Sequence, residues 1–322
     1  MNDWRPSSGS DAAERRAAML ARVREYFSAQ RVLAVDTPTL GRAASSDPNI
    51  DSLRVQSQTA GEFFLHTSPE TLMKRLLADG YPDIYSICRV YRDGESGKRH
   101  SPEFTMIEWY RLGFGLDDIV DDTLRLVAAC LDDDSLLDHV VRLDYDDAFR
   151  NVTGLEVFEA SIGDFAGCAD ADEDLRREIG AERNAWLDLL MSTVIAPVFE
   201  RDRLTVLQHY PADQAALARL CPDDPRLADR FEVFWGDMEL ANGYVELTDA
   251  KEQRRRIDKE LEKRQQLGRP VYPRDRSLVA ALQSGLPDCA GVAVGLERLQ
   301  MVLDKTDDIA DVMTFTTDPT DE

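Results

Sequence analysis

Apolar residues recur along the chain at two spacings, and these spacings predict where helices and strands form. They recur every three to four positions in residues 11–30, 116–131 and 175–198, which predicts three amphipathic helices. Residues 31–40 form an extended run, and its Pro38 suits a sheet edge or a strand end. A long helix followed by such a strand is either a packed α/β unit or a dimer interface.

A β-hairpin is predicted where two alternating apolar runs flank a polar, glycine-containing loop at residues 93–101. The first run begins at Ile84 and the second ends at Tyr110. Five basic side chains lie on or beside the loop: Arg89, Arg92, Lys98, Arg99 and His100. Guanidinium donors next to an imidazole suit a polyphosphate, and Phe104 offers a flat face to a base. The alternative interpretation of the loop, taken alone, is an exposed hairpin whose charges are solvated.

Residues 63–66 are predicted to form a buried strand that leads directly into a helix. Ser68 is expected at the cap of that helix, with Pro69 in the first turn and Glu70 after it. A carboxylate at this position either complements the helix dipole or binds a ligand. Residues 136–171 show no clear periodicity.

Two further strands, residues 231–235 and 238–248, are expected to turn at residues 236–237. Glu239 and Glu246 are seven positions apart and would face opposite sides of a straight strand. We therefore expect a bend or bulge at residues 242–243 that brings both carboxylates to one site. Two carboxylates near a phosphate site suit Mg²⁺, although acidic residues on an exposed strand are also ordinary.

The last third of the chain adds a long polar helix and a glycine-rich strand. Residues 249–268 are expected to form an exposed helix with internal ion pairs, Arg254 with Asp258 and Glu260 with Arg264, although a docking surface for an acidic partner is the alternative.

In the block of residues 288–303, Gly291, Ala293 and Gly295 fall on one face of a strand and leave a bare platform for a ligand. Arg298 projects from the first turn of the helix that follows.

Composition restricts the possible partners and compartment. The 322 residues, 43% of them hydrophobic, are expected to form a single domain over residues 11–322 after a polar tail of residues 1–10. The net charge of −23 repels nucleic-acid phosphate, so DNA is not expected as a partner and tRNA is disfavoured. Five cysteines without a CxxC pair argue against a disulfide scaffold or zinc ribbon, and no apolar run approaches a membrane span. We expect a cytoplasmic protein without membrane contact.

Together these motifs resemble the class II aminoacyl-tRNA synthetases, most closely the lysyl branch. The most specific segments are Thr-Ser-Pro-Glu at 67–70, His-Ser-Pro-Glu-Phe-Thr-Met-Ile-Glu-Trp-Tyr at 100–110, Glu-Leu-Ala-Asn-Gly-Tyr-Val-Glu-Leu-Thr-Asp-Ala at 239–250 and Gly-Val-Ala-Val-Gly-Leu-Glu-Arg at 291–298. The resemblance implies an α+β catalytic domain with an antiparallel sheet flanked by helices. It also implies ATP and Mg²⁺ as cofactors, and a homodimer.

One departure narrows the resemblance. The first family motif begins almost at the N-terminus, where lysyl-tRNA synthetases carry an anticodon-binding barrel. The chain therefore resembles the stand-alone relatives that activate (R)-β-lysine and attach it to a lysine side chain of elongation factor P. Ala293, which replaces a glycine of lysyl-tRNA synthetases, and the segment around Cys289 point the same way. The alternatives are a truncated lysyl-tRNA ligase and a non-catalytic, synthetase-like regulator.

The resemblance also implies roles for individual residues. The implied ATP-binding residues are Arg92, Asp93, Gly94, His100, Phe104, Glu239, Leu240, Gly295 and Arg298, of which Arg92 and Arg298 would be catalytic. The implied residues for the amino-acid substrate are Ser68, Pro69, Glu70, Tyr110, Glu246 and Ala293. Glu239 and Glu246 would hold Mg²⁺. The family's Arg-x-Glu reads Arg92-Asp93-Gly94 here, and Glu95 is the hypothesised substitute.

Overall fold

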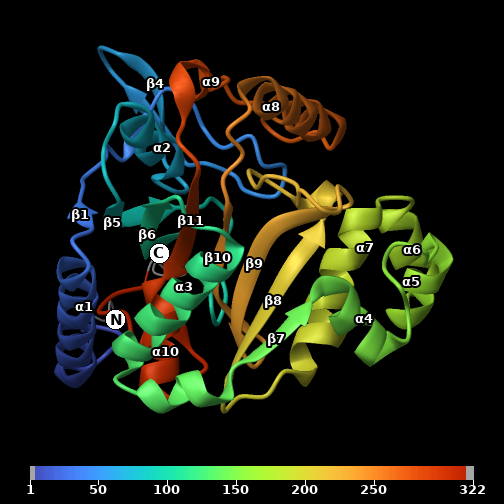
Figure 1. Ribbon diagram of the computed structural model, residues 1–322, viewed down its shortest axis with the longest axis horizontal. Helices are drawn as coiled ribbons and strands as arrows, with labels where there is room; N and C mark the ends of the chain where they lie inside the picture. The colour runs from blue at the N-terminus through green and yellow to red at the C-terminus, as the bar shows by residue number, and fades with distance from the viewer. Residues whose placement is uncertain (1–3, 317–322) are drawn as a thin grey trace.

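The structure is a computed structural model that describes residues 4–316, so residues 1–3 of the predicted tail and residues 317–322 of the predicted domain lie outside it. Its centre is an eight-stranded sheet in the order β1-β5-β6-β11-β10-β9-β8-β7 (Figure 1). The strands are β1 (Leu33–Ala34), β5 (Ile84–Tyr91), β6 (Glu103–Leu112), β7 (Val141–Asp144), β8 (Leu204–Pro211), β9 (Leu227–Trp235), β10 (Met238–Val245) and β11 (Cys289–Gly295).

The predicted α+β class is confirmed, but the sheet is mixed and not wholly antiparallel. Strands β5, β6, β11, β10, β9 and β8 pair antiparallel in turn, whereas β1 is parallel to β5 and β7 is parallel to β8. Parallel neighbours need a long crossover connection, and both edge pairs have one that contains helices. The predicted hairpin of β5 and β6 is confirmed, with Tyr85 paired to Trp109.

Three helices cover one face of the sheet: α1 (Ser10–Ala29), α3 (Leu116–Leu131) and α10 (Leu296–Asp304) (Figure 1). The main apolar core lies between these helices and the strands, and it includes the buried side chains of Phe27 and Trp109. The indole of Trp109 donates a hydrogen bond to Asp122 on α3 at 3.1 Å. The helices predicted over residues 11–30 and 116–131 are thus confirmed.

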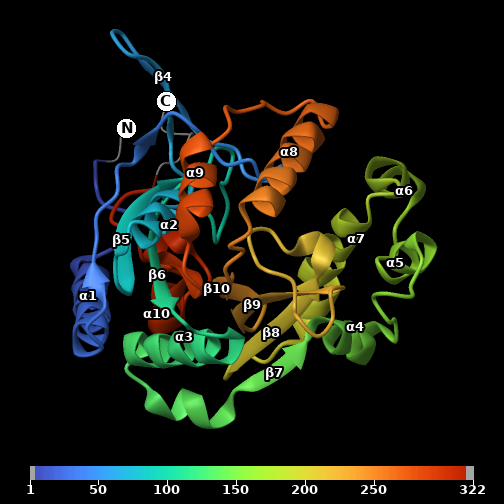
Figure 2. The ribbon, with the colours of Figure 1, turned by 45° about the horizontal axis from the view of Figure 1, so that its top comes forward.

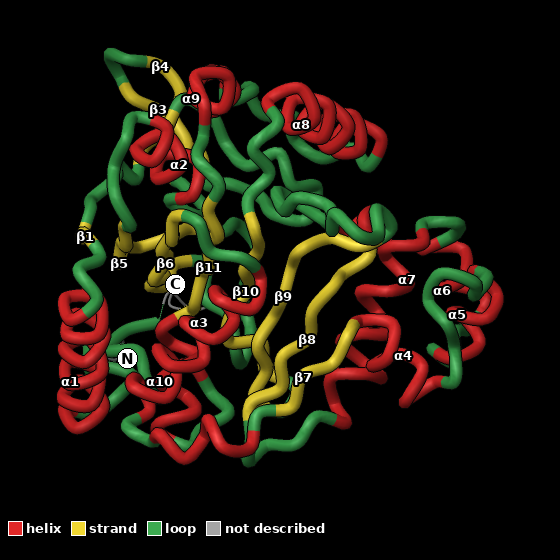
Figure 3. The backbone as a smooth tube through the Cα atoms, viewed as in Figure 1, coloured by secondary structure: helices red, strands yellow, loops and turns green. Residues whose placement is uncertain are grey.

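A second group of helices packs beside the β7 and β8 edge (Figure 3). These helices have their own core, which includes Trp186 and Phe149. They are α4 (Tyr145–Thr153), α5 (Ile162–Cys168), α6 (Glu173–Ile179) and α7 (Arg183–Leu190). The single helix predicted over residues 175–198 is wrong. The helix ends at Gly180, whose φ is +58°, and after α7 the chain continues as a π turn and a short 3-10 turn containing Pro197.

A small sheet and three helices lie at the other end of the central strands (Figure 2). The sheet has the order β2-β4-β3, with β2 (Leu40–Gly41), β3 (Arg54–Ser57) and β4 (Gly61–Leu65), and the helices are α2 (Glu70–Ala78), α8 (Ala250–Gln266) and α9 (Arg276–Gly285). The buried strand predicted at 63–66 is present as part of β4, but only Phe64 is buried and residues 63, 65 and 66 are half-buried, because this small sheet lies outside the main core.

Helix α8 has an exposed face and internal ion pairs of Glu252 with Arg255 and Arg256, as its charges predict in kind, but the two pairs named from the sequence do not form. Arg264 is fully buried and binds Asp51, while Glu260 accepts a hydrogen bond from Ser46 and Asp258 pairs with Arg274 at 2.7 Å. Its charges therefore hold the 45–51 loop and the segment after the helix, and the predicted pairs within the helix are wrong. Within residues 4–316, none of the helices is both long enough and apolar enough to cross a membrane.

Candidate active site

A cavity of about 520 Å³ lies over strands β6, β10 and β11, beneath the hairpin loop and the 45–51 loop. It gathers most of the residues singled out in the sequence: Ser68, Glu70, Arg92, His100, Phe104, Tyr110, Glu239, Leu240, Glu246, Ala293, Gly295 and Arg298. Three of the predicted residues, Pro69, Asp93 and Gly94, are described but do not line it. Glu95 does line the cavity.

Basic side chains converge at one end of the cavity. Arg298 lies at the start of α10, and its Nη2 is 2.8 Å from Nε2 of His100 on the hairpin loop. Burial and the nearby Arg298 both lower the pKa of His100, so the imidazole is neutral at pH 7 and accepts this hydrogen bond. Arg298 Nη1 also donates to the Glu239 carbonyl at 3.0 Å. These contacts hold the guanidinium in place beside the hairpin loop.

Arg92 and Phe104 face each other across the hairpin. The Arg92 guanidinium lies 5.1 Å from the centre of the Phe104 ring, a cation–π distance. Arg92 also reaches Glu95, with 3.5 Å between Nη1 and Oε1. Contacts among the side chains that the resemblance assigns to ATP thus hold the loop. Gly94 has no side chain that could contact Arg92, and Glu95 makes this contact.

The opposite side of the cavity is a buried acidic pocket. Lys74 on α2 donates to Glu70 Oε1 at 2.6 Å and forms an ion pair with Glu246, while the Tyr244 hydroxyl donates to Glu70 at 2.8 Å. Burial lowers the pKa of Lys74, but Glu246 and Glu70 outweigh burial and raise it overall. The Lys74 ammonium therefore stays charged between two carboxylates.

Glu108, at the centre of β6, adds a third carboxylate to this pocket. The Tyr110 hydroxyl donates to Glu108 Oε1 at 2.6 Å and the Ser68 hydroxyl donates to Oε2 at 2.7 Å. Burial, with Glu70 nearby, raises the pKa of Glu108 to about 7, and burial raises that of Glu246 to about 8 against the opposing charge of Lys74. The raised pKa values mean that the single Lys74 ammonium does not offset the three acidic side chains, so a cationic ligand would replace the protons that Glu108 and Glu246 take up.

The glycine-rich strand β11 forms the floor, and the predicted placement of Gly291, Ala293 and Gly295 on its cavity face is confirmed. A Cβ at Gly291 would overlap the Tyr110 ring and come within 2.6 Å of Glu246 Oε1. Gly291 therefore makes room for two pocket side chains, whereas a Cβ at Gly295 would meet open space.

The carboxylates predicted to hold Mg²⁺ both line the cavity, but their neighbours differ. Glu239 lies near Arg298, and Glu246 is paired with Lys74. A second carboxylate close to Glu239 is Glu232 on β9, whose pKa is raised to about 7 by burial and by the Glu239 charge. Oxygen donors of this kind fit Mg²⁺, and Glu246 Oε1 is buried without a hydrogen-bond partner among the described residues.

The predicted strand irregularity is present at a different position. The register of β10 against β9 shifts between Glu239 and Ala241, and not at residues 242–243. Gly243 has another reason to be glycine, because a Cβ there would come within 2.6 Å of the Phe231 ring and 2.8 Å of the Gly291 carbonyl.

Comparison with known proteins identifies the family of the chain. The family model described as tRNA synthetases class II (D, K and N) matches residues 1–319. The chain is 39% identical to a Klebsiella pneumoniae (strain 342) protein and 38% identical to a Pseudoalteromonas translucida (strain TAC 125) protein, each match covering 98% of both chains. A Salmonella gallinarum protein is 37% identical over the same shares. All three relatives are named elongation factor P–(R)-β-lysine ligase.

The chain belongs to the class II tRNA synthetases. The family inferred from the hairpin, the Glu239 strand and the glycine-rich block is thus confirmed, and membership implies the use of ATP. The ligand roles of single residues stay predictions.

Three residues of this site were given no role from the sequence, although Glu108 lies in the quoted segment 100–110. Lys74 had a detectable signal, because it follows Glu70 by one helical turn. Glu108 occupies an inward position of an alternating strand, where a carboxylate is unusual. Glu232 likewise faces inward, but only the pairing of β9 with β10 places it near Glu239.

Proposed function

We propose that this chain is an AMP-forming ligase that activates (R)-β-lysine with ATP and transfers it to a lysine side chain of elongation factor P. The observation that carries the proposal is a single cavity with a buried carboxylate pocket on one side and Arg92, His100 and Arg298 on the other. Such a cavity suits a substrate with two ammonium groups next to a polyphosphate. The names of the relatives favour this activity over aminoacylation of tRNA.

The substrate's ammonium groups are assigned to the acidic pocket. Glu70, Tyr110 and Glu246 supply the polar contacts, and Ser68 and Pro69 place the start of α2 against the substrate. Lys74 balances the carboxylates when no substrate is bound, and Glu108 holds Tyr110 and Ser68 in position. The methyl group of Ala293 lies on the platform beside the proposed substrate carbons and favours an amino group displaced to the β-carbon.

ATP is assigned to the basic end. Arg92 contacts the α-phosphate, His100 and Arg298 contact the outer phosphates, and the adenine stacks on Phe104. Arg92 covers one face of the Phe104 ring in this structure, so stacking uses the other face or displaces Arg92. Leu240 and Gly295 lie beneath the nucleotide, and Asp93, Gly94 and Glu95 form the loop over it.

Mg²⁺ is assigned to Glu239 and Glu246, and Glu232 is a further carboxylate within reach of Glu239. The ion, when bound, neutralises phosphate charge.

The reaction has two steps. An oxygen of the substrate carboxylate forms a bond to the α-phosphorus, and the bond to the β-phosphate breaks to release pyrophosphate. The neutral Nζ of the acceptor lysine then attacks the acyl carbon, AMP leaves, an amide forms and the amine proton passes to solvent. Arg92 and Arg298 stabilise the charge on the phosphate oxygens, and the acidic pocket fixes the carboxylate next to the α-phosphorus.

This chemistry requires no nucleophile on the protein. Cys88 on β5 is the cysteine near Glu108, and burial followed by that negative charge raises the pKa of its thiol to about 12. A covalent acyl-thioester is therefore not part of the proposal.

A truncated lysyl-tRNA ligase is the alternative, and the net charge of −23 disfavours it because tRNA is a polyanion. A non-catalytic regulator is disfavoured by the retention of Arg92, His100 and Arg298 in one cavity with the carboxylates. We place the activity in the cytoplasm, where translation factors are found, and expect no role for DNA or a membrane.

The proposal is tested by ATP–pyrophosphate exchange in the presence of (R)-β-lysine, L-α-lysine, arginine and ornithine. We expect Mg²⁺-dependent exchange with the highest kcat/KM for (R)-β-lysine. Exchange that is equal for all four amino acids, or absent with every one of them, would contradict the assignment.

A further inference from the structure

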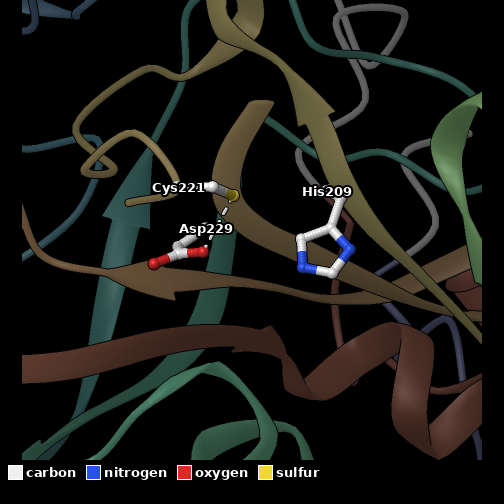
Figure 4. Close-up of side chains that lie close together, drawn as sticks. All are labelled: His209, Cys221 and Asp229. Atoms are coloured by element: carbon white, nitrogen blue, oxygen red, sulfur yellow. Dashed lines mark hydrogen bonds between the residues drawn. The ribbon is translucent and has the colours of Figure 1, made fainter. Parts of the chain in front are cut away.

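A cluster of three different metal-ligating side chains lies outside the active-site cavity (Figure 4). One ligand atom from each of His209, Cys221 and Asp229 lies within 4.8 Å of the other two. His209 is on β8, Asp229 is on the neighbouring β9, and Cys221 lies on the segment that leads into β9. None of the three lines the cavity described above.

The backbone places His209 in an uncommon conformation that aims its ring at the other two residues. The register of β8 against β9 shifts between Gln208 and Tyr210, where β9 has one extra residue, so His209 lies opposite both Asp229 and Arg230; the φ of His209 is +56°. A bulge re-aims a side chain, and a positive φ is uncommon outside glycine. Figure 4 shows Nε2 of His209 on the side that faces Cys221 and Asp229.

The His209 ring and the Asp229 carboxylate each make a further hydrogen bond through the atom that is not assigned to the cluster. His209 Nδ1 lies 2.7 Å from Asp144 Oδ1, which fixes the tautomer and leaves the Nε2 lone pair for another partner. Arg219 donates to Asp229 Oδ2 at 2.6 Å, and the Cys221 thiol donates to Oδ1 at 2.9 Å. A carboxylate on the far nitrogen of a ligating histidine is the usual support of a metal site.

We propose that His209 Nε2, Cys221 Sγ and Asp229 Oδ1 form a binding site for Zn²⁺. A thiolate, an imidazole and a carboxylate are the ligands of zinc, whereas Mg²⁺ prefers oxygen alone. Tetrahedral zinc, with bonds of roughly 2.0–2.3 Å, separates its ligand atoms by about 3.5 Å, so side-chain movements of about 1 Å close the site. Binding releases the Cys221 thiol proton, and thiolate and carboxylate then neutralise the ion.

The fourth position belongs to water. The His209 side chain is 29% exposed and that of Arg219 is 39% exposed, so the site has access to solvent, while Cys221 and Asp229 are buried. This pattern of three protein ligands and one open position differs from the closed Cys-rich sites of zinc ribbons.

The ion would fasten one wall of the active-site cavity. The segment that carries Cys221 also carries Ala216 and Leu217, which line the cavity, and Arg219 N donates to the Val245 carbonyl at 2.9 Å. Ala218 forms a bridge with Glu246 of the acidic pocket. Joining this segment to β8 and β9 through zinc would restrict its movement relative to Glu246.

Titration with Co²⁺, a spectroscopic substitute for zinc, tests the site in the full chain after treatment with a chelator. We expect one Co²⁺ per chain with a thiolate-to-cobalt absorption band, displacement of Co²⁺ by Zn²⁺, and a higher Tm in Zn²⁺. Cys221→Ser should abolish the band, and Asp144→Asn should weaken binding by about 10–100-fold. Cys168→Ser, which removes a partly exposed thiol on α5, is the matched control and should behave as the parent does.

His209→Asn provides an independent test, because asparagine tolerates a positive φ and this variant keeps the thiol. Loss of the band in this variant, with an unchanged circular dichroism spectrum, supports the site. A band of equal intensity in Cys221→Ser, or Co²⁺ binding without a thiolate band, would overturn it and indicate an adventitious ion only. No binding at all would show that Cys221 and Asp229 form only a buried hydrogen bond.

Discussion

Arg298 joins several parts of the proposed ATP site, since its guanidinium contacts His100 and the carbonyls of Glu239 and Arg99. We predict that Arg298→Ala lowers the rate of pyrophosphate exchange by about 10²–10³-fold, because a preorganised charge contact to the phosphates is lost. The matched control is Arg125→Ala, since Arg125 lies exposed on α3, outside the cavity, and pairs with Asp121 at 3.5 Å. Full exchange activity in Arg298→Ala would remove the basis for placing ATP at this end.

The acidic pocket makes a prediction about pH. The pKa of Glu246 is raised to about 8, so below that pH this buried carboxylate holds a proton that a cationic substrate must displace. The KM for (R)-β-lysine should therefore fall as pH rises from about 6 to about 8, by up to roughly tenfold per pH unit for one released proton.

The KM for ATP measured in the same series is the internal control, since ATP is assigned to the other end of the cavity. Glu246→Gln should bind (R)-β-lysine weakly at every pH and should show a flatter dependence. A parent enzyme whose KM for (R)-β-lysine rises with pH over this range would contradict the assignment of the ammonium groups to this pocket.

Sequence patterns predicted the residues that are assigned to ligands, but not the roles of the buried charged residues that contact them. Arg298, His100 and Glu246 stand in specific motifs, so their types and spacing predicted a phosphate and cation site. Lys74 and Glu108 carry weak signals in the sequence, but their roles could be assigned only from the structure, because those roles come from burial next to other charges. Pairing across the sheet and burial are not properties of any single segment.

At the scale of the elements, strand β10 contains a position, Gly243, where neighbouring atoms leave no room for a side chain. We predict that Gly243→Ala destabilises the protein by about 1–3 kcal/mol, because the added Cβ would lie within 2.6 Å of the buried Phe231 ring and 2.8 Å of the Gly291 carbonyl. Urea unfolding should show a lower midpoint with an unchanged slope.

Gly167→Ala is the matched control for this prediction. Gly167 lies in α5, and a Cβ there would meet no atom within 4 Å. The control should leave stability unchanged or raise it by about 0.5–1 kcal/mol through helix propensity. If Gly243→Ala is as stable as the Gly167→Ala control, β10 and its neighbours can accommodate the added Cβ without a loss in the free energy of unfolding, which would contradict the prediction.

The hairpin and the helices α1 and α3 could be predicted because each has a single strong periodicity. The segment from 175 to 198 could not, because its apolar spacing continues through Gly180, where the helix breaks at a φ of +58°. The ion pairs of helix α8 were only partly predicted, since Glu252 pairs within the helix but Arg264, Glu260 and Asp258 reach Asp51, Ser46 and Arg274 in other segments. In both cases tertiary contacts outweigh the local pattern.

At the scale of the whole molecule, the edge formed by α1 and β1 supports a prediction about assembly. Strand β1 has two residues at the end of the sheet, and Leu33 and Leu40 are 45% and 46% exposed. We predict a homodimer built on residues 11–40, because a two-fold partner covers such an edge symmetrically. Sedimentation velocity at micromolar concentration should show a dimer, and Leu33→Glu should shift it to monomer.

Val198→Glu is the control for charge added to an exposed aliphatic position, since Val198 is 57% exposed in a different part of the chain. This variant should remain dimeric. A parent protein that sediments only as a monomer at these concentrations would contradict the predicted interface.

The central claim is that the activated amino acid is passed to a protein. The most direct measurement uses radiolabelled (R)-β-lysine with ATP and Mg²⁺, and offers elongation factor P and lysine tRNA as acceptors in parallel. We predict label on elongation factor P, none on the tRNA, and none on an elongation factor P whose acceptor lysine is replaced by arginine. Label on the tRNA, or exchange activity without label on elongation factor P, would contradict the account.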